Sequence, residues 1–85
     1  MAIFMLDHRH LPHECKIVYA AWKGFDSPLR HDAAFSSCGS GNGARDEHRI
    51  WWTVEAADAD TALAMLPPYV AERTEVNPIG EVRIP

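Results

Sequence analysis

The chain has 85 residues, which is room for a single domain spanning residues 1–85. Its 47% hydrophobic and 24% charged residues are typical of a globular protein and exclude a disordered one. A formal charge of −4 argues against nucleic acid as a partner. No apolar run is long enough to cross a membrane, and two cysteines are too few for a disulfide scaffold. We therefore predict a cytoplasmic protein with free thiols.

The first half of the chain predicts a strand, a helix and a second strand. Residues 2–10 are apolar at both alternating sets of positions, as in a strand that is covered on both faces. A helix is predicted from Pro12 to Gly24, and residues 33–38 predict a short strand. The glycine-rich residues 39–47 predict a mobile hairpin tip. Apolar residues at helical spacing form the stripe that the helix is expected to bury: Leu11, Cys15, Val18, Trp22 and Phe25.

The second half predicts a strand, a helix and a final strand. Residues 48–55 have the strongest strand character in the chain. Asp58 or Asp60 is expected to cap the following helix, which ends at Pro67 and Pro68. One helical turn is expected over residues 69–73, before a last strand at residues 75–84 that could be broken at Pro78-Ile79-Gly80. The buried side of the capped helix is predicted to carry Ala62, Leu63 and Leu66.

The predicted order is βαββαβ. With right-handed crossovers it gives an α+β, ferredoxin-like fold, a four-stranded antiparallel sheet with two helices on one face. Trp51 and Trp52 are consecutive in a strand and must point to opposite faces, so one of them leaves the helix layer. Such a face needs a cover. We therefore predict a homodimer or higher homo-oligomer in which two sheets pack face to face as a dimeric α/β barrel.

The second half of the chain also carries a family resemblance. The strand His-Arg-Ile-Trp-Trp-Thr-Val-Glu-Ala leads into a helix, a Leu-Pro-Pro break and the segment Glu-Val-Asn-Pro-Ile at residues 75–79. This run is similar to the muconolactone-isomerase-like branch of the dimeric α/β-barrel superfamily. The resemblance implies the barrel fold and a small-molecule site between the sheet and its partner, and it assigns no catalytic residue. Families of that superfamily that bind nickel or other metals resemble the chain about equally.

Histidines are the main candidates for chemistry. His8 and His10 project from one face of the first strand. In a ferredoxin-like sheet the first and third strands are antiparallel neighbours, which brings His48 towards them. Three imidazoles could hold Zn²⁺, Ni²⁺ or Cu²⁺, and one neutral imidazole could instead act as a general base. Polar residues at the end of a strand, with no further role, are the simpler alternative.

Four other residues are candidate substrate contacts. Trp51 or Trp52 could form an apolar wall, and Arg30 could bind a carboxylate through its paired donors. Tyr69 could offer its hydroxyl to a pocket or cap the core. Cys15 lies on the buried helix stripe, and we predict an inert core thiol there.

Three functions remain open from the sequence. The first is a small-molecule enzyme or binder of the muconolactone-isomerase-like type, without a cofactor, in which His8 or His10 moves a proton. The second is a protein that binds a divalent transition metal through His8, His10 and His48. The third is a non-catalytic dimerisation module.

Overall fold

A computed structural model describes residues 1–32, 34–37 and 48–85. These parts of the chain form an α+β structure, as predicted, in which a four-stranded antiparallel sheet is joined by short helices. The strands are β1 (Ala2–His10), β2 (Phe35–Ser36), β3 (His48–Ala56) and β4 (Thr74–Ile79). The α-helices are α1 (Cys15–Ala20), α2 (Ala59–Leu63) and α3 (Pro68–Ala71), and the 3₁₀ helices are η1 (Pro12–Glu14) and η2 (Pro28–Arg30). The hairpin tip predicted at residues 39–47 lies outside the described residues.

The sheet has the strand order β2-β3-β1-β4, and each neighbouring pair is antiparallel. The two long strands, β1 and β3, lie side by side at its centre, with Leu6 opposite Trp52 and His10 opposite His48. β4 pairs with the other edge of β1, where Leu6 is opposite Val76. The first and third strands are therefore adjacent and antiparallel, as the sequence predicts.

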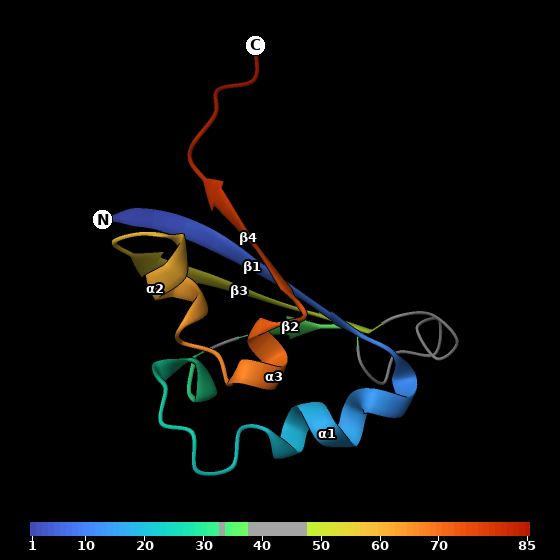
Figure 1. Cartoon of the computed structure of the whole chain (residues 1–85). Helices are drawn as coiled ribbons and strands as arrows, with labels where there is room; N and C mark the ends of the chain where they lie inside the picture. The colour runs from blue at the N-terminus through green and yellow to red at the C-terminus, as the bar shows by residue number, and fades with distance from the viewer. Residues whose placement is uncertain (33, 38–47) are drawn as a thin grey trace.

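The two faces of the sheet differ in character. The helices lie on one side of the sheet (Figure 1). The even-numbered side chains from Phe4 to His10 in β1 and throughout β3 are buried on that side. This core is completed by Val18, Ala62, Leu66 and Val70. Odd-numbered side chains point to the other side, here called the open face, where Phe35 is 76% exposed. Trp52 is 4% exposed in the core and Trp51 is on the open face, so the predicted division of the two tryptophans is confirmed.

Local sequence signals explain most helix boundaries. Pro12 begins the first turn, and Gly24, with φ of 73°, ends the segment in the left-handed conformation that glycine adopts most easily. The Asp58 carboxylate accepts a hydrogen bond from the Thr61 N–H at 2.8 Å and caps α2. Pro67 separates α2 from α3, the extra turn that the sequence predicts.

Three elements are shorter in the structure than the sequence predicts. The first helix is only Cys15–Ala20, and Leu11, placed on its buried stripe, is about half exposed because it precedes the helix. The final strand ends at Ile79, at the break that Pro78-Ile79-Gly80 allowed, rather than at residue 84, and residues 80–85 extend away from the sheet (Figure 1). β2 pairs with β3 over only two residues. No helix in the described residues is long and apolar enough to span a membrane.

Candidate metal centre

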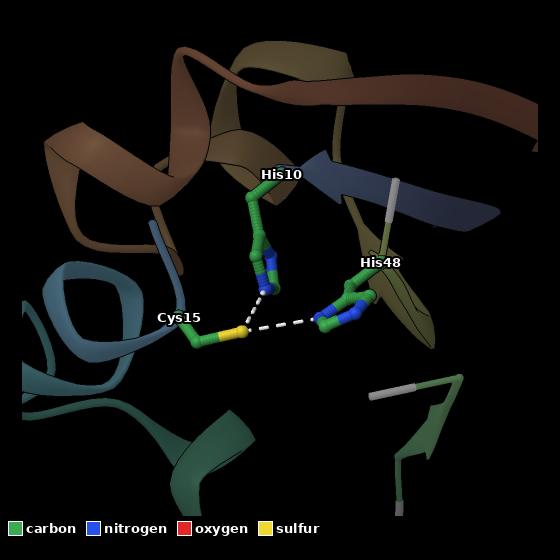
Figure 2. Close-up of side chains that lie close together, drawn as sticks. All are labelled: His10, Cys15 and His48. Atoms are coloured by element: carbon green, nitrogen blue, oxygen red, sulfur yellow. Dashed lines mark hydrogen bonds between the residues drawn. The ribbon is translucent and has the colours of Figure 1, made fainter. Parts of the chain in front are cut away.

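Three side chains with metal-ligating atoms meet at one end of the sheet, under the first turn of α1. They are His10 at the end of β1, Cys15 at the start of α1 and His48 at the start of β3 (Figure 2). The Cys15 Sγ lies 3.4 Å from His10 Nε2 and 3.1 Å from His48 Nδ1. One ligand atom from each residue lies within 4.8 Å of the other two. We call this set the His₂Cys cluster.

The backbone brings the three side chains of the His₂Cys cluster together. His10 and His48 are direct partners in the β1–β3 register, so their side chains stand next to each other on one face. The chain then turns through η1, where the Glu14 N–H bonds to the Leu11 carbonyl at 2.8 Å. This turn carries Cys15 back over the end of the sheet. His10 is 2% exposed, His48 is 8% exposed and Cys15 is half-buried, so the cluster is largely shielded from water.

His8 extends the cluster into a line of hydrogen bonds. Its Nε2 lies 2.9 Å from His10 Nδ1, and its Nδ1 lies 3.2 Å from the Val70 carbonyl oxygen. A carbonyl can only accept, so a neutral His8 donates from Nδ1 and accepts at Nε2. His10 then donates from Nδ1 and turns the lone pair of its Nε2 towards Cys15. The main chain of Val70 thus fixes the tautomer of His10 through His8.

Burial favours the neutral forms of His8 and His10. Desolvation, together with the neighbouring His10, lowers the pKa of His8 to about 4. Desolvation and the neighbouring His48 also lower the pKa of His10. A neutral imidazole is the form that binds a metal ion, so His10 is in its binding form at neutral pH. The Nε2 atom of His48 is buried and has no hydrogen-bond partner among the described residues.

A network of hydrogen bonds and an ion pair stabilises the η1 turn, which precedes Cys15. Glu14 accepts hydrogen bonds from the Tyr69 hydroxyl at 2.5 Å, from Arg73 Nε at 2.8 Å and from the Leu11 N–H at 3.0 Å. These donors, the Tyr69 hydroxyl first, lower the pKa of Glu14 to about 2. The Arg73 guanidinium lies 3.7 Å from the centre of the Tyr69 ring. Glu14, the residue before Cys15, is therefore bonded to Tyr69 in α3 and to Arg73, which directly precedes β4.

The candidate residues from the sequence divide between the two sides of the sheet. His8, His10 and His48 cluster at one sheet end as predicted, on the side that the helices cover. They face away from any space that a partner on the open face would enclose, so an acid/base role there does not fit the geometry. His8 lies outside the set of converging ligand atoms, which Cys15 completes in its place.

The four predicted substrate contacts do not form one site. Trp52 and Arg30 line the same cleft on the helix side, whereas Trp51 borders a hollow on the open face. Tyr69 lines neither of these spaces, and its hydroxyl donates to Glu14.

Cys15 is the residue that the sequence interpretation missed. Its place in an apolar stripe predicts a core thiol, but the residue is half-buried at the sheet end and its thiol contacts two imidazoles. The signal that could have found it is its position five residues after His10, across a turn that begins with Pro12.

Comparisons with known proteins add no assignment. The sequence matches no protein-family model and no curated protein, and the fold matches no solved structure. Function must therefore be inferred from the geometry of the site itself.

Proposed function

We propose that the protein binds a divalent transition-metal ion through His10 Nε2, Cys15 Sγ and His48 Nδ1. The observation that carries this proposal is the spacing of the three atoms. Zinc–sulfur bonds of about 2.3 Å and zinc–nitrogen bonds of about 2.0–2.1 Å, at tetrahedral angles, separate the two ligand atoms by about 3.5 Å. The Cys15 Sγ lies 3.4 Å and 3.1 Å from the two nitrogens, so small shifts would accommodate an ion.

The donor set favours zinc. Two imidazoles and a thiolate are borderline-soft ligands, which suit Zn²⁺ and its spectroscopic substitute Co²⁺ better than the oxygen-seeking Mg²⁺ or Ca²⁺. The hydrogen bond from His10 Nδ1 to His8 is the kind of support that orients ligating histidines in metalloproteins. Binding requires that Cys15 lose its proton and that a proton on His48 Nδ1 move to Nε2.

A Co²⁺ titration of the metal-free protein tests the site. We expect one equivalent to produce a thiolate-to-cobalt charge-transfer band, which Zn²⁺ then removes by displacement. Cys15→Ser should abolish the band, and His48→Ala should weaken binding strongly. His8→Phe, which removes the support of His10 but no ligand, should weaken binding by about 10- to 100-fold.

Two variants serve as matched controls. His13→Ala removes an exposed histidine outside the cluster and should leave the titration unchanged. Cys38→Ser leaves Cys15 as the sole thiol, so the band should persist. Circular dichroism confirms that each variant is folded. A band that survives Cys15→Ser, or no band in the wild-type protein, would refute the proposal.

The sheet itself supports a second proposal, a ferredoxin-like subunit that dimerises through its open face. The strand order β2-β3-β1-β4, antiparallel throughout, is compatible with that fold. The open face carries Ile3, Phe35 and Ile79, each at least 40% exposed, and a hollow of about 500 Å³ beside Met5 and Trp51. Monomeric proteins seldom leave such a surface uncovered. A muconolactone-isomerase-like activity would require this cover, but with residues other than His8 and His10.

Charges on the open face are compatible with burial in a dimer. Asp7 accepts hydrogen bonds from Arg49 and Arg9 within the same subunit. The Arg49 guanidinium lies 5.2 Å from the centre of the Trp51 ring. A second copy would therefore cover paired charges rather than isolated ones, which avoids the largest desolvation cost.

Solution mass tests the dimer. We expect light scattering at micromolar concentration to give twice the 9.5 kDa subunit mass, and Trp51→Glu to give the subunit mass by placing a charge in the interface. Glu55→Lys, an exposed change on the same face of β3, is the control for altered charge alone. A wild-type mass near 9.5 kDa would contradict the dimer.

A further inference from the structure

A second cleft lies on the helix side of the sheet, between α1, the η2 turn and β3. Its volume is about 320 Å³, at the lower end of the range for small-molecule sites. Apolar side chains form its walls, with Trp22 from the turn after α1, Leu29 from η2, and Ile50 and Trp52 from β3. The rings of Trp22 and Trp52 are 5.9 Å apart and tilted by 47°. Walls of this kind suit a flat aromatic molecule.

The indole N–H of Trp52 does not reach the surface of the cleft. The Trp52 side chain lines the cleft and is 4% exposed. The indole Nε1 is buried without a hydrogen-bond partner among the described residues. An indole N–H usually finds an acceptor when it is buried. Because this N–H is shielded, Trp52 contributes its ring face to the cleft, and the polar contact for a ligand comes from the rim.

The rim of the cleft carries one charge of each sign, on Arg30 and Asp32. Arg30 donates through Nη1 to the Phe25 carbonyl at 3.3 Å, which anchors the guanidinium and leaves its other N–H groups for a ligand. A carboxylate can pair with those groups. Asp32 would repel a second negative charge, so the rim favours a ligand with a single carboxylate.

The cleft adjoins the His₂Cys cluster. Tyr19, which lines the cleft, follows Cys15 by four residues and therefore lies on the same side of the first helical segment. Ile50 follows His48 by two residues and shares its face of β3. A molecule in the cleft would lie beside the cluster, although the cleft walls are complete without a metal ion.

We propose that this cleft binds a flat aromatic monocarboxylate, with the ring between Trp22, Trp52 and Leu29 and the carboxylate at Arg30. The proposal does not depend on the metal site, because no wall of the cleft belongs to the His₂Cys cluster. It also places the small-molecule site on the opposite side of the sheet from the one that the family resemblance implies.

The probe for the test is 2-naphthoate, added to metal-free protein in the presence of a chelator. The three indole N–H signals in a ¹H–¹⁵N NMR spectrum, assigned with single Trp→Phe variants, report the location. We expect the signals of Trp52 and Trp22 to shift and to saturate, and the signal of Trp51, on the opposite face, to stay in place.

Variants identify the contacts. Arg30→Gln should weaken 2-naphthoate binding by about tenfold but leave binding of the neutral 2-naphthamide nearly unchanged. Trp52→Phe reduces the area of the aromatic wall and should weaken binding several-fold. Trp51→Phe and Arg83→Gln, in the exposed C-terminal segment, are the matched controls and should have no effect.

Three outcomes would overturn the proposal. They are shifts that do not saturate, a shift confined to Trp51, and an Arg30→Gln variant that binds 2-naphthoate as tightly as the wild type. Because the titration excludes metal, its failure would leave the cobalt experiment unaffected, and the reverse also holds.

Discussion

Acidification from pH 7 to pH 4 should lower the free energy of unfolding by about 2–3 kcal/mol through His8. The folded protein holds the pKa of His8 at about 4, because the ring is buried and next to His10, whereas the ordinary value is 6.5. Between these two pH values the unfolded chain binds a proton that the folded chain does not. The stability associated with neutral His8 is therefore complete above pH 6.5 and declines as the pH falls towards 4.

Urea unfolding at a series of pH values measures this decline. His8→Gln removes the titrating ring, so this variant should be less stable at pH 7 but should lose less stability on acidification. His13→Ala, which changes an exposed histidine, should follow the wild-type curve. An equally steep decline in His8→Gln and in the wild type would rule out His8 as the source.

The largest packing effect is expected at Leu6. This side chain is fully buried and lies opposite Trp52 on one side and Val76 on the other. Leu6→Ala removes three carbon atoms from a closed core and should reduce the free energy of unfolding by about 3–4 kcal/mol. Denaturant unfolding of the two proteins at pH 7 gives the difference directly.

Met5→Ala is the matched comparison, because Met5 is the next residue and points to the open face. In a monomeric subunit, Met5→Ala should reduce the free energy of unfolding by about 1 kcal/mol or less, because the side chain is only partly buried. If the open face forms a dimer, the cost should instead increase with protein concentration. Equal effects of the two substitutions in dilute solution would contradict the assignment of the helix-covered face.

The sequence predicts the central part of the sheet well. Alternation in residues 48–55 and the consecutive Trp51 and Trp52 indicate a strand with two different faces, and the structure has one. The pairing of His10 with His48 follows from the order of elements. The extents of short elements are less predictable, because the length of β2 depends on its pairing with β3 rather than on its own composition.

The candidate metal site was only partly predictable, because it depends on how the elements pack against one another. The histidines share a face because strand periodicity requires it, but periodicity does not indicate which face the helices cover. Cys15 was assigned to the core by its spacing from Val18 and Trp22, although a thiol at the first residue of a helix lies over the sheet end rather than over its centre. The contact with His48 is set by the turn at η1, whose path cannot be read from apolar spacing.

The His₂Cys cluster draws its members from segments that are distant in the chain. The Cys15 and His48 atoms that meet are separated by 33 residues, and His8 is bonded to a carbonyl 62 residues away. An ion held by all three ligands would bind only after β1, β3 and the η1 turn had assembled. Its binding energy would then be absent from a folding transition state in which these segments have not yet met, and it would slow unfolding while leaving the rate of folding nearly unchanged.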